Sequence, residues 1–374
     1  MDWLRCALPR TIKDTTRLRH PFVIKHITQA LSIALEHPSY ATLNLSNYFR
    51  TQRSLGSKDR RRVQDAVYGL IRHQGLITRA GYWNSHDWAE IWASICEGER
   101  FEDISAQSPK QDFACALSLP NHISDIFFNT FSEQDCLQLA LLINTPPPIY
   151  LRTKQGSRLK IQNKLHKQQI ITTPTEGMRN TLQVEGRANI LGSRSFQDGL
   201  IEIQDLSSQQ LCERISSLGE RFLDLCAGAG GKSLALANEG KTVFANEPRS
   251  HAQRELQKRA KRARLKISTQ LPQADSMDVV LIDAPCSGSG RLHRDPALRW
   301  RIAFEEHTKV QKELLKYATT FVRSGGYIVY ATCSLFDAEN KHIIPKGYSI
   351  EERYILPNNQ DGFYWHIWRY GESS

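Results

Sequence analysis

The stretch VVLIDAPCSGSG (residues 279–290) joins an apolar run to a turn that carries a thiol. An apolar run that ends in polar residues and glycines is typical of a buried parallel strand and its following loop. A second strand with the same kind of ending is predicted in YIVYATCS (residues 327–334). If both strands belong to one parallel sheet, Cys286 and Cys333 lie at its carboxyl edge, where open α/β sheets bind ligands. Two thiols and the carboxylate of Asp283 at one edge indicate covalent chemistry.

The sequence on both sides of this stretch alternates between strand and helix patterns. From residue 206 onward the predicted elements are the strand RFLDL, a helix from Gly231, the strand TVFAN, a helix over 249–263, the strand VVLID, a helix over 305–322 and the strand YIVYAT. Strands that alternate with helices in this order predict a doubly wound parallel sheet. We therefore expect an α/β, Rossmann-like domain over residues 206–374.

The preceding residues divide at a proline-rich run. Residues 20–143 repeat apolar groups at helical spacing, and a long helical stretch is expected to start near Leu119. The run Asn144-Thr145-Pro146-Pro147-Pro148 cannot continue a helix. Strands near 149–153, 182–184 and 201–203 and a basic helix over 158–169 follow it. We predict an all-helical domain over 1–143 and a small α+β subdomain over 144–205.

The helix around residues 59–71 combines an apolar face with basic residues. Its basic rim is predicted to consist of Arg60, Arg61, Arg62, Arg72 and His73. Either an RNA-binding helical domain or a solvated helix face accounts for this pattern, and the sequence leaves both open.

The composition of the 374 residues narrows the class of partner and compartment. Lys and Arg number 49 against 39 Asp and Glu, and the net charge of +10 favours a polyanionic partner. The eight cysteines form neither a C-x-x-C pair nor a zinc-like cluster, so we expect reduced thiols and no metal. The first 20 residues lack the apolar core of a signal peptide, and no apolar run reaches 18 residues. We therefore expect a cytoplasmic protein that does not enter the membrane.

A glycine-rich loop follows the first strand of the predicted sheet, in DLCAGAGGKS (residues 224–233). A phosphate-binding P-loop would need glycine at Cys226, and a dinucleotide fingerprint would need it at Ser233. What remains is an acidic residue before a small glycine turn, the pattern typical of S-adenosylmethionine sites. The next strand ends in Glu247, about twenty residues on, where an acid binds ribose hydroxyls. A tight turn with a structural capping acid is the alternative.

Four motifs together resemble the RsmB/Sun (nucleolar-protein/Sun) family of RNA cytosine-5 methyltransferases. They are FQDGLIEIQDLSSQ (196–209), DLCAGAGGKS (224–233), DAPCSGSGRLHRDPALRW (283–300) and GGYIVYATCSL (325–335). The resemblance covers residues 146–340, with a further match at 361–364. It implies a NusB-like helical RNA-binding region at the N-terminus, S-adenosylmethionine as methyl donor and ribosomal RNA as substrate.

Carried over residue by residue, the resemblance implies roles for individual side chains. Cys333 corresponds to the nucleophile, Cys286 to the thiol that helps to release product, and Asp283 to the carboxylate that meets the target cytosine. The cofactor contacts correspond to Asp283, Glu247 and the loop residues Cys226, Ala227, Gly228, Ala229, Gly230, Gly231 and Lys232. The residues themselves favour packing over chemistry for Cys226, and leave Lys232 to steer either the base or the methionine carboxylate.

The chemistry explains why two thiols are needed. Carbon 5 of cytosine becomes nucleophilic only after a thiolate has added to carbon 6, and the thiol must leave again after methyl transfer. A free thiol is only a few per cent ionised at neutral pH, so activation by helix N-terminal amides beyond Ser334 or by basic groups is expected. A DNA cytosine-5 methyltransferase would use the Pro-Cys thiol alone, and Cys333 argues against it. The alternative to catalytic thiols is that both cysteines are unreactive residues that pack at the strand ends.

Two departures from the family pattern keep a rival of another class open. The strand that leads through Ser268-Thr269-Gln270 lacks the acid that touches the adenine, and the region from Lys341 to Asp361 is short. A helix and a strand are therefore expected to be reduced there. The rival is a catalytically weak RNA-binding or ribosome-assembly factor that retains the methyltransferase fold.

Two basic clusters are candidates for contacts with RNA phosphates. The segment 249–266 carries eight basic residues against one acid, and either phosphate contacts or a solvated helix face explains it. The residues expected to hold the target strand are Arg291, His293, Arg294, Arg299 and Arg301. His293 is expected to face the surface or the RNA. The target base must leave its stack, which favours single-stranded or loop RNA, and we expect a monomeric enzyme.

Overall fold

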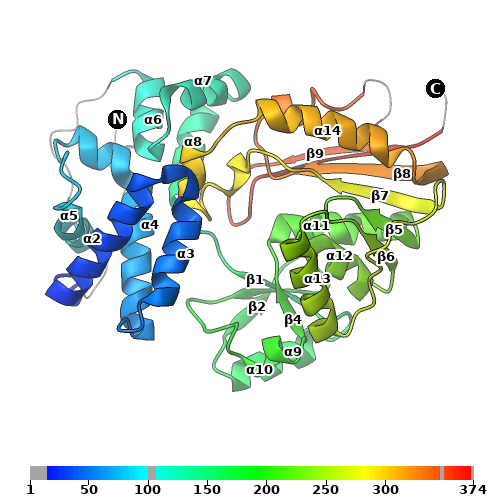
Figure 1. Ribbon diagram of the computed structural model, residues 1–374, viewed down its shortest axis with the longest axis horizontal. Coiled ribbons are helices and arrows are strands. Elements are labelled where there is room, and N and C mark those ends of the chain that lie inside the picture. Colours follow the sequence, from blue (N-terminus) through cyan, green and yellow to red (C-terminus); the bar gives the residue numbers. More distant parts are fainter. Residues whose placement is uncertain (1–14, 100–106, 346–348, 372–374) are drawn as a thin grey trace. The chain divides into compact units, whose positions relative to one another are not determined.

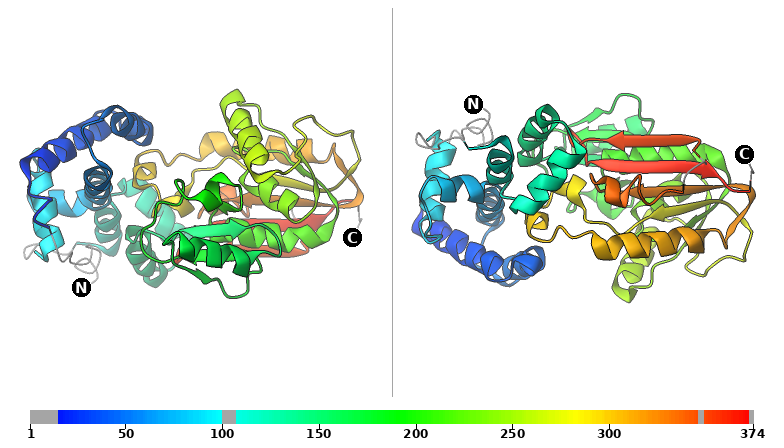
Figure 2. Two further views of the ribbon diagram at one scale, coloured as in Figure 1. Left: turned by 90° about the horizontal axis from the view of Figure 1, so that it is seen from below. Right: turned by 90° about the horizontal axis from the view of Figure 1, so that it is seen from above.

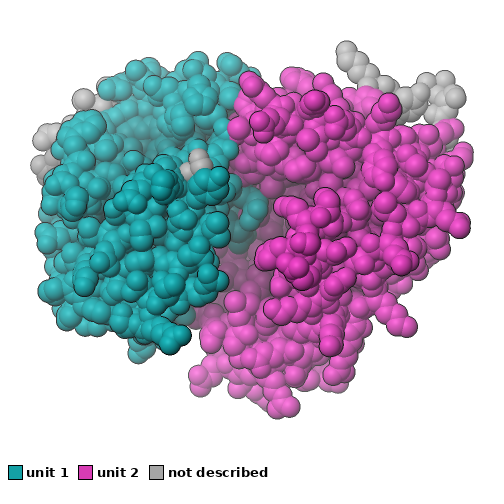
Figure 3. All heavy atoms as spheres, viewed as in Figure 1, with its two compact units in different colours: residues 1–146, 291–302 teal, residues 147–290, 303–374 magenta. Residues whose placement is uncertain are grey.

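The structure, a computed structural model, describes residues 15–99, 107–345 and 349–371. The N-terminal segment with Cys6 lies outside the described residues. The chain forms two compact units, residues 1–146 with 291–302 and residues 147–290 with 303–374 (Figure 3). Within the described ranges no helix is both long and apolar enough to cross a bilayer. The predicted boundary between residues 205 and 206 falls inside the second unit and stays a prediction.

The first unit is helical, as predicted for this part of the chain (Figure 1). Its elements are α2 (Pro21–Glu36), η1 (Pro38–Tyr40), α3 (Ala41–Thr51), α4 (Ser57–Arg79), α5 (Trp88–Glu97), α6 (Pro109–Leu117), α7 (Asn121–Thr130), α8 (Glu133–Asn144) and η4 (Pro296–Trp300). Helix α4 forms the centre, with Val63, Ala66 and Leu70 fully buried. The single stretch predicted after Leu119 is two helices, because Ser132 caps a new one by accepting a hydrogen bond from the Asp135 amide.

The segment 291–302 belongs to the helical unit and is bound there by buried polar groups. Arg72 donates a hydrogen bond to the carbonyl of His293 (2.8 Å), and Arg299 donates one to the carbonyl of Arg72 (2.8 Å). Arg72 and His73 are buried, so their assignment to an exposed basic rim is wrong. His293 and Arg299 are buried as well, and the prediction that they hold the target RNA is wrong. Arg72 and its partners His293 and Arg299 are more than 200 positions apart in the sequence, so the sequence alone did not indicate their contact.

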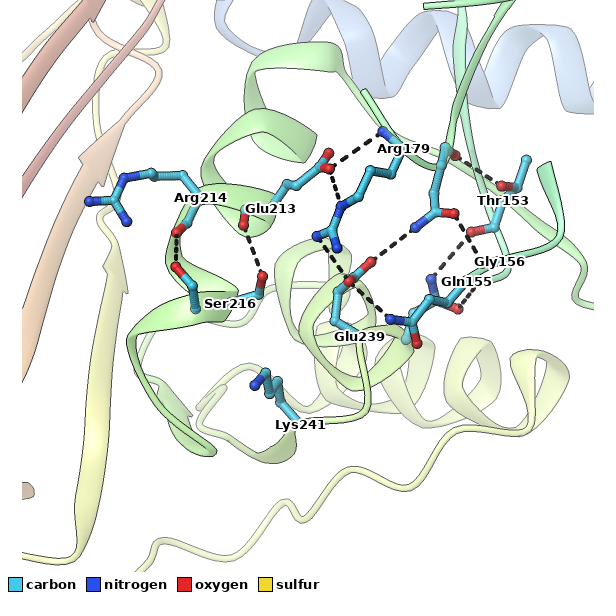
Figure 4. Close-up of polar contacts among 12 residues, drawn as sticks. Thr153, Gln155, Gly156, Arg179, Glu213, Arg214, Ser216, Glu239 and Lys241 are labelled. Carbon is cyan, nitrogen blue, oxygen red and sulfur yellow. Dashed lines mark hydrogen bonds and ion pairs between the residues drawn. The ribbon is translucent and has the colours of Figure 1, made fainter. Parts of the chain in front are cut away.

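The second unit begins with a small four-stranded antiparallel sheet in the order β2-β3-β1-β4. Its elements are β1 (Tyr150–Thr153), α9 (Arg158–Lys167), β2 (Thr172–Pro174), β3 (Thr181–Val184), α10 (Arg194–Gln197) and β4 (Ile201–Ile203). Leu151, Ile161 and Leu182 lie in its core. A polar cluster joins this sheet to the rest of the unit (Figure 4). In it Arg179 pairs with Glu213 and Glu239.

The larger sheet has six strands in the order β6-β5-β7-β8-β10-β9. Its elements along the chain are α11 (Leu206–Ile215), η2 (Ser216–Leu218), β5 (Arg221–Asp224), α12 (Gly231–Asn238), β6 (Thr242–Ala245), α13 (Ser250–Ala263), β7 (Met277–Asp283), η3 (Ser289–Arg291), α14 (Glu305–Ala318), β8 (Val322–Thr332), η5 (Asp337–Glu339), β9 (Glu351–Ile355) and β10 (Phe363–Arg369). Strands β6, β5, β7 and β8 are parallel, as predicted. Strands β10 and β9 are antiparallel additions, so the sheet is mixed (Figure 2).

Side chains that alternate along these strands build two separate cores. Phe222, Leu281 and Val329 point to one face, where α11 and α12 cover them. Leu223, Ile282 and Tyr330 point to the other face, where α14 covers them (Figure 1). The sheet is therefore a middle layer between helices, and the predicted α/β, Rossmann-like fold is confirmed. All three sequence motifs that end strands β5, β7 and β8 then lie at one edge of the sheet.

Candidate active site

The loops after β7 and β8 bring the two predicted thiols together. Cys286 and Cys333 are half-buried, and their sulfur atoms lie 3.4 Å apart. The parallel pairing of the strands sets this distance, because Asp283 lies opposite Ala331 in the register. Cys286 follows Asp283 by three residues, and Cys333 follows Ala331 by two. The hydrogen bond that Cys286 shares with Cys333, together with burial, raises the pKa of Cys286 well above that of a free thiol.

A close backbone approach fixes these two loops against each other. The amide of Gly290 donates to the carbonyl of Cys333 (2.8 Å), and the amide of Gly362 donates to the carbonyl of Gly290 (2.9 Å). A Cβ atom on Gly290 would come within 2.2 Å of the Gly362 carbonyl oxygen and 2.9 Å of the Cys333 carbonyl oxygen. Glycine is therefore required at position 290 for the thiols to lie side by side.

A buried polar network beneath the thiols escaped the sequence analysis. Glu339 is fully buried and accepts hydrogen bonds from the Ser287 amide (2.8 Å), the Ser287 hydroxyl (2.5 Å) and the Gln311 side chain (3.3 Å). Ser289 accepts a hydrogen bond from the Leu335 amide (2.8 Å), which links the same two loops again. A carboxylate with this many donors holds the Pro-Cys loop rigidly. The sequence offered only a weak signal, an acid six residues beyond Cys333.

Lys232 and Asp283 form an ion pair next to the thiol loops. The Lys232 ammonium lies 2.6 Å from a carboxylate oxygen of Asp283 and 5.0 Å from the ring centre of Phe363. Burial alone would lower the pKa of Lys232, but the charge and hydrogen bond of Asp283 outweigh it, so the pKa is raised. Lys232 therefore stays charged and holds Asp283 in place. Asp283 remains the more exposed partner, with 33% of its side chain accessible.

The glycine loop between β5 and α12 leaves room for a ligand. Gly228 (φ 53°) and Gly230 (φ 84°) adopt left-handed backbone angles that favour glycine. A Cβ atom on Gly228 or Gly231 would meet no protein atom within 4 Å, so the backbone faces open space there. The loop leads directly into the N-terminus of α12, where amides favour an anionic group. This arrangement fits a cofactor that lies against the backbone, with its carboxylate at the start of the helix.

Asp224 supports the glycine loop from below. It is almost completely buried and accepts a hydrogen bond from the Ser233 hydroxyl (2.6 Å). Burial raises the pKa of Asp224 to about 6. One of its oxygen atoms has no hydrogen-bond partner in the described protein. Through its hydrogen bond with Ser233, Asp224 stabilises the conformation of the loop.

Glu247 follows β6 and accepts hydrogen bonds from the glycine loop and from the N-cap residue of α13. Its carboxylate accepts from the Gly228 amide (2.9 Å) and from the amide of Arg249 (2.9 Å). The Arg249 guanidinium also binds both carboxylate oxygens, at 2.7 and 2.9 Å. The hydrogen bond and charge of Arg249 lower the pKa of Glu247, which is therefore ionised at neutral pH. The sequence analysis predicted Glu247 but missed its pairing with Arg249.

Comparisons with known proteins identify the domain that carries these loops. Residues 216–364 match the family model of the 16S rRNA methyltransferase RsmB/F. This domain belongs to the RsmB/F family. The chain is 30% identical over 245 residues to a probable ribosomal RNA small subunit methyltransferase B of Synechocystis, covering 60% of this chain and 55% of the relative. It is 27% identical over 301 residues to the ribosomal RNA small subunit methyltransferase B of Vibrio cholerae, covering 71% and 68%.

The resemblance to the RsmB/Sun family read from the motifs is thus confirmed. The chain spans about half the length of the first curated relatives, 55% for the Synechocystis protein and 52% for the Proteus mirabilis protein. Among solved structures, the protein PH0851 covers 93% of this chain and 98% of its own, with a TM-score of 0.72 at 20% identity. A methyltransferase homologue from Pyrococcus horikoshii covers 71% and 99%, with a TM-score of 0.59 at 20% identity. These likenesses show the fold.

The two departures from the RsmB/Sun pattern have structural counterparts. The strand expected beside β6 is reduced to one bridge between Ser268 and Phe244. The strand end that would carry the adenine-binding acid is therefore missing from this part of the described structure. After β8, the described residues contain η5, a turn of three residues, in place of a longer helix. The expected activation of Cys333, by helix N-terminal amides beyond Ser334 or by basic groups, stays a prediction. Strand β9 is present, so the expected reduction affects the helix and spares the strand.

The basic segment after β6 divides into structural and exposed cations. Arg259 and Arg262 both pair with the buried carboxylate of Glu202, so these two do not face solvent as phosphate contacts would. In the cofactor loop, burial raises the pKa of the Cys226 thiol, and a raised thiol pKa favours a packing role over a chemical one. The exposed basic residues of α13 and the turn that follows it are Arg254, Lys258, Lys261, Arg264 and Lys266.

Proposed function

We propose that this chain transfers a methyl group from S-adenosylmethionine to carbon 5 of a cytosine in RNA, and that the RNA is ribosomal. The match of residues 216–364 to RsmB/F supports the reaction class, and the names of the curated relatives support the substrate. The observation that carries the proposal is the pair of sulfur atoms 3.4 Å apart, on two strand ends beside Asp283. Two adjacent thiols suit a reaction in which one sulfur bonds to the base and the other helps to release it.

Cys333 is the proposed nucleophile. Its thiolate adds to carbon 6 of the cytosine, the sulfur–carbon bond forms, and the electron pair of the ring double bond moves toward carbon 5. A protonated Cys286 can donate a hydrogen bond to the sulfur of Cys333, which lies 3.4 Å away. Carbon 5 then takes the methyl group.

Asp283 is proposed to hydrogen-bond ring nitrogen 3 and so to stabilise the electron density that the adduct places on the ring. In the proposed step the carboxyl of Asp283 carries the proton once the base is bound, whereas in the ligand-free protein Asp283 is ion-paired with Lys232. Lys232 fixes the position of the carboxyl through its 2.6 Å contact. Product release requires removal of the proton on carbon 5, after which the carbon–sulfur bond breaks and the ring double bond returns. Cys286, after its own thiol proton has passed to solvent, is proposed to accept the proton from carbon 5, directly or through a relay.

The residues of the loop fit S-adenosylmethionine, which supplies the methyl group as an activated sulfonium. Open space over Gly228 and Gly231 admits the cofactor to the backbone, and Glu247 lies where an acid can accept bonds from ribose hydroxyls. The proposed contacts are Asp283, Glu247 and residues 226–232.

Methyl transfer from labelled S-adenosylmethionine to small-subunit ribosomal RNA tests this function. The wild type should label cytosine at carbon 5, and Cys333→Ala should abolish the labelling. A matched control is Cys115→Ala, which removes a thiol of the helical unit and should retain activity. Full activity of Cys333→Ala would refute the nucleophile. A wild type that binds RNA and transfers no methyl group would instead favour the assembly-factor alternative.

A further inference from the structure

The hydrogen bonds of Glu247 leave its carboxylate with no vacant acceptor position. One oxygen accepts from the Arg249 amide (2.9 Å) and from Arg249 Nε (2.7 Å). The other accepts from the Gly228 amide (2.9 Å) and from Arg249 Nη2 (2.9 Å). A carboxylate has about four lone-pair sites, and these four donors fill them. Two hydroxyl groups of a ribose would therefore have to replace donors that are already bound.

The four donors differ in how easily they can be exchanged. The two backbone amides are held by the loop and by the start of α13, and they do not leave without refolding of the chain. The guanidinium stands on a flexible side chain that is 74% exposed, whereas the Glu247 side chain is only 2% exposed. Water and salt compete for the guanidinium, the exposed partner of this pair, and so weaken its attraction to the carboxylate. The two guanidinium bonds are thus the ones that a ligand can displace.

We propose that the Arg249 guanidinium competes with the ribose hydroxyls of the cofactor for Glu247, so that Arg249 sets the affinity for the cofactor. The inference rests on the proposed function, in which Glu247 binds the ribose. The wild type then binds the cofactor only in the fraction of molecules whose guanidinium has left Glu247. Its apparent affinity is reduced by that fraction. Removal of the guanidinium leaves Glu247 oriented by the two amides and open to the ribose.

Calorimetric titration with S-adenosylhomocysteine measures this competition without turnover. This probe carries the ribose, has no net charge and cannot donate a methyl group. Arg249→Gln should tighten its Kd by about two- to fivefold, the range expected for loss of a weak ion pair whose guanidinium is exposed. Arg254→Gln is the matched control, since it removes an exposed arginine from the same helix, and its Kd should equal that of the wild type.

Salt and a second substitution separate competition from a merely structural effect. Higher ionic strength weakens the ion pair, so the wild type should bind more tightly as salt rises, and Arg249→Gln should not. In a Glu247→Gln background, Arg249→Gln should have no further effect on Kd. Unchanged or weaker binding by Arg249→Gln, in a wild type that binds the probe, would overturn the competition alone. A wild type that binds no probe at all would contradict the proposed function.

Discussion

In the proposed mechanism Cys286 and Cys333 have different roles, although their sulfur atoms lie only 3.4 Å apart. Two sulfur atoms at this distance cannot both ionise easily, and the shared hydrogen bond is the largest reason for the raised pKa of Cys286. That cause disappears once the sulfur of Cys333 is bonded to carbon, because the bonded sulfur carries no charge. Cys286 is then easier to deprotonate at the stage at which the proposed mechanism needs a base.

Replacement of this second thiol should stop the reaction after methyl transfer. In Cys286→Ala, Cys333 can still add to the base, but the proton on carbon 5 has no nearby acceptor. A covalent protein–RNA complex should accumulate and migrate slowly on a denaturing gel. The double variant Cys286→Ala/Cys333→Ala should form none. Normal turnover by Cys286→Ala would remove Cys286 from the release step.

Local sequence determined how much of the site could be predicted. The thiols and the glycine loop each lie in a short motif whose chemistry is readable without the fold. The pairing of Arg249 with Glu247 and the network around Glu339 depend on side-chain directions and long-range packing, which a motif does not contain. Glu339 is buried by strand ends that are adjacent only in the folded sheet.

Among the elements, helix α4 departs most from its predicted character. His73 is buried and its ring stacks on Trp92 (ring centres 6.0 Å apart). Burial, together with the charges of Arg72 and Arg299, lowers the pKa of His73 to about 3. Its unfolded pKa is near 6.5, so below that value the unfolded chain takes up a proton that the folded helix excludes. The contribution of the neutral, buried His73 to the free energy of unfolding is therefore present above pH 6.5 and is lost as the pH falls toward 3.

The protein should accordingly be sensitive to mild acid. Between pH 7 and pH 5 the free energy of unfolding should fall by about 2 kcal/mol from His73 alone. His73→Phe keeps the ring on Trp92 and should lose this part of the pH dependence. Urea unfolding at both pH values, followed by tryptophan fluorescence, measures the difference. Contributions of other groups, such as Asp224, occur in both proteins and cancel. An equal pH dependence in the two proteins would contradict the burial argument.

The remaining elements were predictable to different degrees. Strands β5, β6, β7 and β8 and helix α13 follow their hydrophobic patterns closely, since each pattern repeats at one period. The antiparallel direction of β10 was not predictable, because an apolar strand sequence does not encode the direction of its neighbour. The strand beside β6 is reduced to a bridge at Ser268, and the segment there lacks a sustained apolar run.

At the scale of the whole molecule, the net charge of +10 is the property most relevant to a polyanionic substrate. Part of this charge does not face solvent. Arg72, Arg152 and Arg299 are buried, and Arg259 and Arg262 are engaged with Glu202. The exposed cations of α13 and of the turn that follows it are available to contact phosphates. Binding that uses them should release counterions and weaken as salt rises.

The salt dependence of RNA binding should therefore identify the face that contacts phosphates. Lys258→Gln/Lys261→Gln on α13 should lower the slope of log K against log salt by about 1.4 on a single-stranded RNA, about 0.7 per lost contact. The matched control is Lys309→Gln/Lys312→Gln on α14, which removes the same charge from exposed positions. Filter binding over a range of salt measures both. Equal slopes for the two pairs would show that net charge, and not the face, governs binding.

The chain leaves the second unit after Gly290 and returns to it at Ala303, so each unit is built from two pieces of sequence. A fragment that began at residue 147 would retain residues 291–302 without their surroundings, and would present Leu292, Ala297 and Arg299, all fully buried here, to water. The helical unit is therefore not a detachable module. In evolution or in the laboratory, its replacement by another domain would require two coordinated exchanges, one of them beginning five residues after Cys286.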